Sequence, residues 1–110
     1  MKDCVFCKIV KGELPSTKEY EDKDVLVFQN IKPAAETHLL IVPKKHKSSF
    51  MDLSGSDISS MFEVAQKLIK DKKLSDGYKL VFNGGKFQFV PHIHWHLLAG
   101  KFEKDFEEKL

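Results

Sequence analysis

The sequence predicts an α+β fold in which an antiparallel sheet packs against one long helix. Two observations support this prediction: runs rich in β-branched and aromatic residues follow one another along the chain, and a single amphipathic stretch is inserted among them. The connections between these runs are short, which favours antiparallel pairing. With 110 residues, 42% of them hydrophobic, the chain is long enough for one core, and we expect a single domain over residues 1–110.

The first half of the chain predicts a short helix followed by three strands. Residues 4–11 form the helix or turn, which Gly12 and Pro15 end. Residues 30–36 form a loop, because Pro33 restricts the residue before it and has no backbone N–H to donate. The three runs with strand composition lie around Tyr20, at residues 25–28 and at residues 38–43.

The long helix is predicted in the middle of the chain. Ser54 and Asp57 offer N-caps, and Asp76-Gly77 marks a stop. Apolar side chains between these points recur at i, i+3, i+4 and i+7, which predicts an amphipathic helix of about four turns. The stripe comprises Ile58, Met61, Phe62, Ala65, Leu68 and Ile69.

The last part of the chain predicts two strands and a tail. Residues 78–82 alternate as a strand, residues 83–85 give a strong turn signal, and residues 92–98 form the final strand. In the tail, residues 101–110, apolar side chains four positions apart make a weak helical stripe. These side chains are Phe102, Phe106 and Leu110.

Charge and hydropathy exclude several classes of protein. The net charge of +2 is too small to indicate a nucleic-acid-binding protein. No apolar run approaches the ~18 residues that span a bilayer, and the N-terminus lacks the apolar segment of a secretory signal. We therefore expect a cytoplasmic protein without nucleic-acid or membrane partners. All 18 basic residues are lysine, so a bound anion must be held by histidine, lysine, amide or backbone N–H groups.

The only cysteines, Cys4 and Cys7, form a CxxC pair near the N-terminus. In a cytosolic protein such a pair indicates a metal or redox site before it indicates a structural disulfide. A thioredoxin-like redox site needs a strand leading into the motif, and only three residues precede Cys4, so metal binding is favoured. Two small buried side chains near a terminus are the alternative. Zinc would need two further ligands from elsewhere in the chain.

Three of the five histidines, His92, His94 and His96, occupy alternate positions of the final predicted strand. Strand side chains alternate between faces, so the three rings share one face and the apolar residues between them share the other. Such a row can chelate a metal. It can also act in catalysis, because a neutral imidazole nitrogen is a nucleophile near pH 7 and a neighbouring ring can hold a phosphoryl oxygen. The spacing leaves both interpretations open; in the catalytic one the middle residue, His94, attacks.

The segment His92-Ile93-His94-Trp95-His96-Leu97-Leu98 resembles the signature of the histidine triad (HIT) family, His-φ-His-φ-His-φ-φ, in which φ is hydrophobic. The opening CVFCKIVKGELPS, the run FQNIKPAAETHLLIVPKKH and the block DGYKLVFN extend the resemblance over nearly the whole chain. It is strongest to the branch of small nucleoside-phosphoramidate hydrolases with an N-terminal CxxC. The resemblance implies a five-stranded antiparallel sheet with one long and one short N-terminal helix, and a homodimer in which two sheets join.

The same resemblance implies an activity and the residues that perform it. These proteins hydrolyse the bond between the α-phosphate of a purine nucleotide and an amine through a nucleotidyl-histidine intermediate, without an organic cofactor; dinucleotide polyphosphates are the alternative substrates. His94 matches the nucleophile, and His96 and His38 match positions that bind the phosphate and assist proton transfer. The positions that match nucleotide contacts are Phe6, Phe28, Asn30, Ile31, Asn83 and the backbone near Phe89.

The resemblance also extends to the zinc ligands of zinc-containing members of this branch. Cys4 and Cys7 match two zinc ligands, and His46 and His92 match the other two. This set implies one closed, four-coordinate and therefore structural zinc site per chain. His92 would then serve zinc rather than the chemistry.

Three features depart from the family pattern. Asn30 stands where an Asp usually binds the ribose, and Phe89 stands where a Ser or Thr usually contacts the leaving group. The connection from Asn83 to His92 is about two residues shorter than usual. Phe89 and Asn30 favour an alternative function, a nucleotide-binding or interaction module with weak or no catalysis. A third hypothesis assigns all histidines and both cysteines to zinc storage.

Overall fold

A five-stranded antiparallel sheet forms the centre of the computed structural model, which describes residues 4–103. The order of strands across the sheet is β1-β2-β3-β5-β4, so the two strands that carry histidines, β3 and β5, are neighbours. The predicted α+β class and the five-stranded sheet are confirmed. The strands are β1 (Lys18–Glu21), β2 (Val25–Gln29), β3 (Ala35–Pro43), β4 (Lys79–Phe82) and β5 (Trp95–Phe102).

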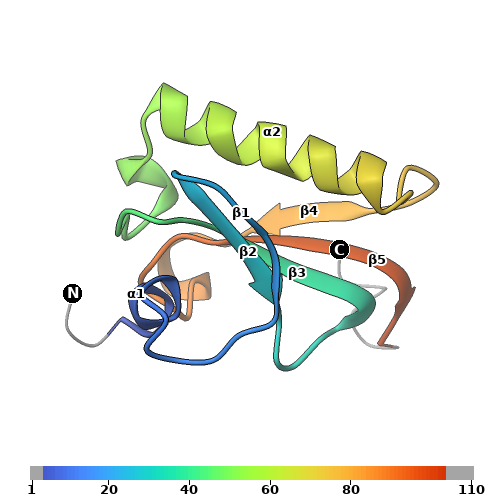
Figure 1. The fold of residues 1–110 in the computed structure, drawn as a ribbon, viewed down its shortest axis with the longest axis horizontal. Coiled ribbons are helices and arrows are strands. Elements are labelled where there is room, and N and C mark those ends of the chain that lie inside the picture. Colours follow the sequence, from blue (N-terminus) through green and yellow to red (C-terminus); the bar gives the residue numbers. More distant parts are fainter. Residues whose placement is uncertain (1–3, 104–110) are drawn as a thin grey trace.

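Two α-helices cover opposite faces of this sheet (Figure 1). The long helix α2 (Gly55–Asp71) packs on one face, over a core that includes Trp95. The short helix α1 (Val5–Val10) packs on the other face, where Phe6 meets Phe28. The connections also contain two 3₁₀ turns that the sequence does not predict, η1 (Phe50–Asp52) and η2 (Gly85–Phe87).

Capping and an apolar stripe determine the extent of α2. The Ser54 hydroxyl accepts the Asp57 backbone N–H at 3.1 Å, and the Asp57 carboxylate accepts the Ser54 N–H at 2.8 Å. This reciprocal pair satisfies two N–H groups at the helix start. The helix ends at Asp71, earlier than the predicted stop at Asp76-Gly77, because Lys73 takes a left-handed conformation with φ of 57°. Its buried side chains are Met61, Val64, Ala65 and Leu68.

The final strand begins later than the sequence predicts. β5 starts at Trp95, so His92 and His94 precede it instead of lying within it. The alternation of faces nevertheless holds across this boundary. Ile93 and Trp95 belong to the core beneath α2, whereas His92 and His94 pack against Phe6 of α1.

Two other boundaries also differ from the prediction. β3 begins at Ala35, inside the loop predicted over residues 30–36. The helical stripe predicted for the tail is wrong at its start, because Lys101 and Phe102 complete β5; residues 104–110 lie outside the described part of the chain. Within residues 4–103, no helix combines the length and apolar character needed to cross a membrane.

Candidate active site and metal centre

β3 and β5 bring together two histidines that are distant in the sequence. In the antiparallel register His38 lies opposite Leu98 and Leu40 lies opposite His96, so His38 and His96 form a diagonal pair on one face. Nε2 of His38 lies 2.8 Å from Nδ1 of His96. The ring of His94 follows, with its centroid 5.1 Å from that of His96. The three predicted catalytic histidines are therefore adjacent.

One ring nitrogen of His94 is committed to a backbone contact. Its Nδ1 lies 2.9 Å from the carbonyl oxygen of His92, and a carbonyl can only accept, so Nδ1 carries the proton. The neutral ring then holds its lone pair on Nε2. Burial lowers the pKa of His94, because a charged ring would lose its hydration. His94 is thus a neutral imidazole at pH 7 with an unprotonated Nε2, as a nucleophile requires.

His38 and His96 adopt complementary tautomers. The backbone N–H of Ala34 donates to Nδ1 of His38 at 2.9 Å, so the proton of the neutral His38 ring is on Nε2. This Nε2–H donates to Nδ1 of His96, which leaves the proton of neutral His96 on its own Nε2. The row therefore presents a lone pair on His94 beside an N–H donor on His96.

Burial also keeps the His38–His96 pair neutral. It lowers the pKa of His38, and it lowers the pKa of His96 to about 4, with neighbouring His94 and His38 adding to the effect. A phosphoryl anion beside the rings would raise the pKa values of both histidines, since a nearby negative charge favours the imidazolium form. A proton taken up when an anion binds must go to a ring nitrogen that accepts a hydrogen bond in this structure, either Nδ1 of His38 or Nδ1 of His96.

Aromatic side chains form a wall beside His94. The ring of Phe6 packs edge-to-face on His94, with centroids 5.0 Å apart, and on Phe28, with centroids 5.5 Å apart. Phe6 and Phe28 are 6% and 3% exposed, respectively. Two of the predicted nucleotide contacts thus lie together next to the predicted nucleophile. The same cluster includes Ile9, Leu40, Val42 and the half-buried Val90.

Asn30 lies beside the histidine pair. Its Oδ1 accepts the backbone N–H of Lys32 at 2.9 Å, which identifies the amide oxygen, and its Nδ2 lies 3.3 Å from Nε2 of His38. Nε2 of His38 already carries a proton, so the two groups are both donors. Asn30 therefore turns an N–H donor toward the histidines, where a carboxylate would offer an acceptor.

The other predicted nucleotide contacts do not touch the histidines. Ile31 and Phe89 are each 91% exposed, and Asn83 is half-buried just after β4. Within residues 4–103, no hydrogen bond or ring contact joins any of the three to the histidine row. The Gln88 side chain donates to the Val90 carbonyl at 2.9 Å and so holds the loop on either side of Phe89.

All four predicted metal ligands converge at the start of α1. Cys4 Sγ lies 3.3 Å from Nδ1 of His92, and Cys7 Sγ lies 3.2 Å from Nδ1 of His46. The four donor atoms lie within 4.8 Å of one another. In a tetrahedral zinc site with Zn–S and Zn–N bonds of about 2.3 and 2.1 Å, sulfur and nitrogen donors are ~3.6 Å apart. The residues therefore fit a Cys2His2 zinc site.

The outer nitrogens of both histidines in this cluster have partners. Nε2 of His92 donates to the Pro43 carbonyl at 2.8 Å, which leaves the lone pair of the neutral ring on Nδ1, facing the sulfurs. Nε2 of His46 lies 3.4 Å from the Ser48 hydroxyl. Partners of this kind orient the imidazole ligands of metal sites. His92 is completely buried, so its orientation is tightly constrained.

Sequence reasoning missed the backbone groups that set these tautomers. The carbonyls of His92 and Pro43 and the N–H of Ala34 determine which nitrogen carries the proton in His94, His92 and His38. Every residue carries such groups, so no sequence signal distinguishes the three. Only the register and the loops around it bring them into range.

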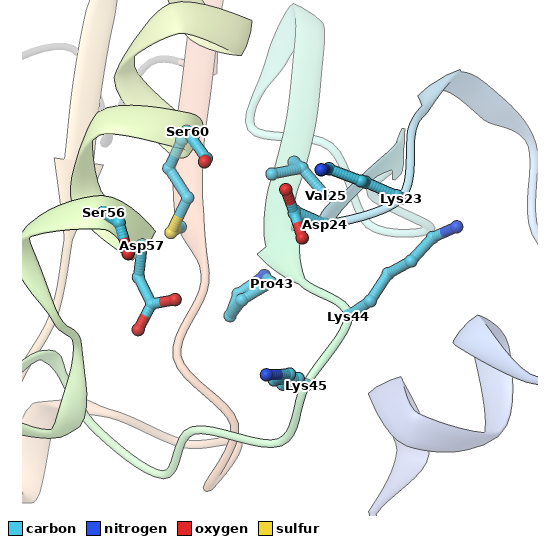
Figure 2. Close-up of a pocket in the computed structure, with 10 residues that line it drawn as sticks. Lys23, Asp24, Val25, Pro43, Lys44, Lys45, Ser56, Asp57 and Ser60 are labelled. Carbon is cyan, nitrogen blue, oxygen red and sulfur yellow. The ribbon is translucent and has the colours of Figure 1, made fainter.

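A cavity of about 210 Å³ lies elsewhere, between the start of α2, the start of β2 and the end of β3 (Figure 2). Side chains of both charges line it, and Lys44 extends away from α2 to pair with Glu21 at 2.7 Å. None of the predicted catalytic, nucleotide-binding or metal-ligating residues lines this cavity. The candidate site is therefore the histidine row and not this cavity.

The chain is similar to known proteins over most of its length. A family model described as Scavenger mRNA decapping enzyme C-term binding matches residues 3–110. An adenosine 5'-monophosphoramidase of Saccharomyces cerevisiae is 41% identical over 103 residues, which cover 92% of this chain and 65% of the yeast protein. A 14 kDa zinc-binding protein of Zea mays is 42% identical over 105 residues, covering 88% of this chain and 81% of the maize protein.

A solved structure matches the fold as well as the sequence. A histidine triad protein from Clostridium difficile superposes with a TM-score of 0.86 and 43% identity. The match covers 92% of this chain and 93% of the other. Sequence and fold thus point to the same group of proteins.

Proposed function

The chain belongs to the histidine triad family, and from this we propose that it is a hydrolase that cleaves purine nucleoside phosphoramidates at the α-phosphate. The observation that carries the proposal is the lone pair on Nε2 of His94 beside the N–H donor on His96. Similarity to an adenosine 5'-monophosphoramidase supports the substrate class. Dinucleotide polyphosphates, which also carry an α-phosphate, are a second class to assay.

In the proposed reaction, Nε2 of His94 attacks the α-phosphorus. A bond forms between Nε2 and phosphorus, and the P–N bond to the amine breaks. The Nδ1–H of His94 stays donated to the His92 carbonyl and stabilises the charge that the ring acquires. Water then attacks the same phosphorus, the nucleotide leaves, and His94 returns to its neutral form.

The His38–His96 pair supplies the proton in this scheme. The anionic substrate favours uptake of one proton from solvent at Nδ1 of His96, which displaces the hydrogen bond that this nitrogen accepts from His38 in the substrate-free structure. Nε2 of His96 then passes its own proton to the departing amine. The neutral pair that results accepts a proton from the attacking water in the second step. Before substrate binds, the 2.8 Å hydrogen bond from His38 orients the ring of His96.

We assign the proposed nucleotide contacts to the three parts of the nucleotide. Phe6, Phe28 and Ile31 form an apolar wall for the base, a type of site that discriminates little between adenine and guanine. Asn30 contacts the ribose. The phosphate is held by His96, the Asn83 amide and backbone N–H groups near Phe89, since the chain has no arginine.

We further propose that Cys4, Cys7, His46 and His92 hold one zinc ion per chain. Four protein ligands close the coordination sphere, so the zinc supplies structural stability and no catalytic position. Burial raises the pKa of the Cys7 thiol, and the neighbouring Cys4 adds to the effect, so a pair of thiolates there needs a cation beside it. The proposed imidazole chemistry requires no organic cofactor. We also propose a cytoplasmic location, because a reducing compartment keeps the cysteine ligands from forming a disulfide.

We also propose that the protein forms a homodimer whose interface lies along the edge strand β4. β4 lies at one end of the sheet and leaves one edge of backbone groups without a strand partner among the described residues. Phe62 of α2 and Phe82 of β4 are 50% and 42% exposed, and both pack on Trp95. Nε1 of Trp95 is buried and lacks a hydrogen-bond partner in this part of the chain. A second copy here would cover both phenylalanines and join the two sheets.

The His94→Ala variant tests the mechanism. We expect it to lose turnover of adenosine 5'-phosphoramidate by on the order of a thousandfold or more, because no other group can take the place of the nucleophile. Circular dichroism and the oligomeric state should match the wild type. The exposed Glu63→Ala change on α2 is a matched control that retains activity. Turnover by His94→Ala at the wild-type rate would exclude the proposed mechanism.

A second candidate function is a nucleotide-binding module with little catalysis. It is favoured by Phe89, which is 91% exposed and cannot donate a hydrogen bond, and by the amide of Asn30. Titration with a purine monophosphate, run beside the turnover assay, separates the two candidates: binding without turnover supports the module. The zinc-storage hypothesis requires more than one zinc per chain, whereas residues 4–103 form one such cluster.

A further inference from the structure

We propose that Cys4 and Cys7 are positioning residues for His94, so that zinc binding at the N-terminus holds the catalytic ring in its reactive tautomer. The role of His94 as nucleophile rests on the proposed function. The physical link between the metal cluster and the ring of His94 does not rest on the proposed function, because it follows from contacts in the structure.

The first link is His92, which belongs to both sites. Its Nδ1 lies 3.3 Å from Cys4 Sγ and 3.5 Å from Cys7 Sγ, and its Nε2 is held by the Pro43 carbonyl at 2.8 Å. The carbonyl oxygen of the same residue accepts the Nδ1–H of His94 at 2.9 Å. Fixing the ring of His92 therefore also fixes the acceptor that selects the tautomer of His94.

The second link is Phe6, which lies between the two cysteines in α1. Its ring contacts His92 and His94 edge-to-face, with centroid distances of 5.9 and 5.0 Å. Because both flanking cysteines belong to the cluster, their position sets where the Phe6 ring meets His94. The cluster thus acts on His94 from two sides, through a hydrogen bond and through a packed ring.

The placement of α1 depends on the cluster because the helix is short. α1 has six residues, and a helix of this length is not stable without tertiary contacts. Its N-cap is Cys4, whose sulfur accepts the Cys7 N–H at 3.4 Å. Thiols are weak hydrogen-bonding groups, whereas coordination to a shared ion ties both cysteines to His46 and His92. A bound zinc would therefore convert a loosely held helix end into a fixed one.

The consequence concerns which nitrogen of His94 is protonated. If the His92 carbonyl moves, the neutral ring of His94 can place its proton on Nε2 instead, and in that form Nε2 has no lone pair to attack phosphorus. Neither Asn30 nor Phe28 carries a ligand atom of the cluster. Phe6, however, belongs to the proposed base wall and lies between the two cysteines, so zinc loss should lower kcat through His94 and also raise KM through Phe6.

Nuclear magnetic resonance of protein labelled with ¹⁵N in its histidines measures the tautomers directly. In zinc-loaded protein we expect His94 to be protonated on Nδ1. After zinc is removed with a chelator at the same pH, a second population protonated on Nε2 should appear, while His38 keeps its Nε2 proton as an internal reference. In parallel, kcat should fall on the order of tenfold, which is the effect typical of groups behind a functional residue.

Two variants make the test specific. His46→Asn removes one ligand but leaves both cysteines beside His92, and it serves as the test protein if the chelated wild type unfolds by circular dichroism. It should have low zinc content by atomic absorption and mixed His94 tautomers. Lys8→Ala changes α1 without removing a ligand, and it should keep zinc, the Nδ1–H signal and kcat.

Folded, zinc-free protein in which His94 stays protonated on Nδ1 and kcat is unchanged would overturn the coupling. The same result in zinc-free His46→Asn would overturn it equally. Absence of turnover by zinc-loaded wild type would contradict the proposed function instead. The tautomer comparison would still decide the coupling in that case, because it needs no substrate.

Discussion

Burial determines the charge of the individual histidines in the row. His38, His94 and His96 sit on a face that α1 and the loop before β5 partly cover, and each loses hydration that a charged ring would need. The rings are therefore neutral at the pH where an imidazole in water is partly charged. In the proposed reaction, the neutral form of His94 preserves its lone pair, and the neutral form of His96 delays proton uptake until an anion binds.

The lowered pKa of His96 predicts a pH-dependent stability. The unfolded chain binds a proton to this ring below about 6.5, but the folded protein does so only below about 4. The free energy of unfolding should therefore decrease as the pH falls through this window, and the loss should level off below it. We expect on the order of 2 kcal/mol from this group, since a pKa unit corresponds to about 1.4 kcal/mol and solvent screens a half-buried ring.

Urea unfolding followed by the fluorescence of Trp95 measures this effect between pH 7 and pH 4. The His96→Asn variant is the matched comparison, because it removes the titrating group while keeping a polar side chain. Its stability should fall less steeply with acid than that of the wild type. Parallel curves for the two proteins would show that His96 is not the group responsible.

Replacing Asn30 by Asp should strengthen nucleotide binding. The carboxylate can still accept the Lys32 N–H, and it offers the ribose hydroxyls a charged acceptor in place of the Nδ2 donor. We expect the affinity for AMP to rise by the order of 1 kcal/mol, or about fivefold, in isothermal titration calorimetry. With 2'-deoxy-AMP the gain should be smaller, since one hydroxyl is missing. Equal gains with both nucleotides would place Asn30 away from the ribose.

At the scale of elements, composition and periodicity predicted the framework well. The apolar run that became β3 and the helical stripe of α2 have physical causes within the segment itself, so both were found from sequence. The boundaries were less predictable. β3 continues to Pro43, but β5 pairs with it only from Trp95, opposite Ile41. Before that point the Ile93 N–H donates to the Lys47 carbonyl at 2.7 Å, a partner outside the sheet that the composition of the segment does not indicate.

Short elements were the least predictable part of the fold. The turns η1 and η2 consist of three residues each and carry no periodicity to detect. α1 was predicted from its residues, but its location on the histidine face follows from Cys4, Phe6 and Cys7 finding partners far along the chain. The residues of the metal cluster were therefore predictable by family resemblance, and their convergence required the fold.

At the scale of the whole molecule, the exposed aromatic edge predicts the oligomeric state. Phe62→Glu together with Phe82→Lys should convert the proposed dimer to a monomer, because charges replace the apolar surface on both sides of Trp95. Analytical ultracentrifugation measures the mass directly. Leu14→Glu, a change at an apolar residue of similar exposure in the connection between α1 and β1, should leave it unaltered. A monomeric wild type would refute the proposed dimer.

The position of β3 between β2 and β5 has a consequence for folding kinetics. β2 and β3 are close in sequence and can pair early, whereas the contact of His38 with His96 closes a loop of 58 positions. Closing it costs on the order of 4 kcal/mol of chain entropy, a cost that native contacts offset only once β5 has docked. We therefore expect intermediates that already contain the β1–β2–β3 meander but bind no nucleotide. Substrate binding should recover in refolding only with the slowest phase, when β5 pairs with β3.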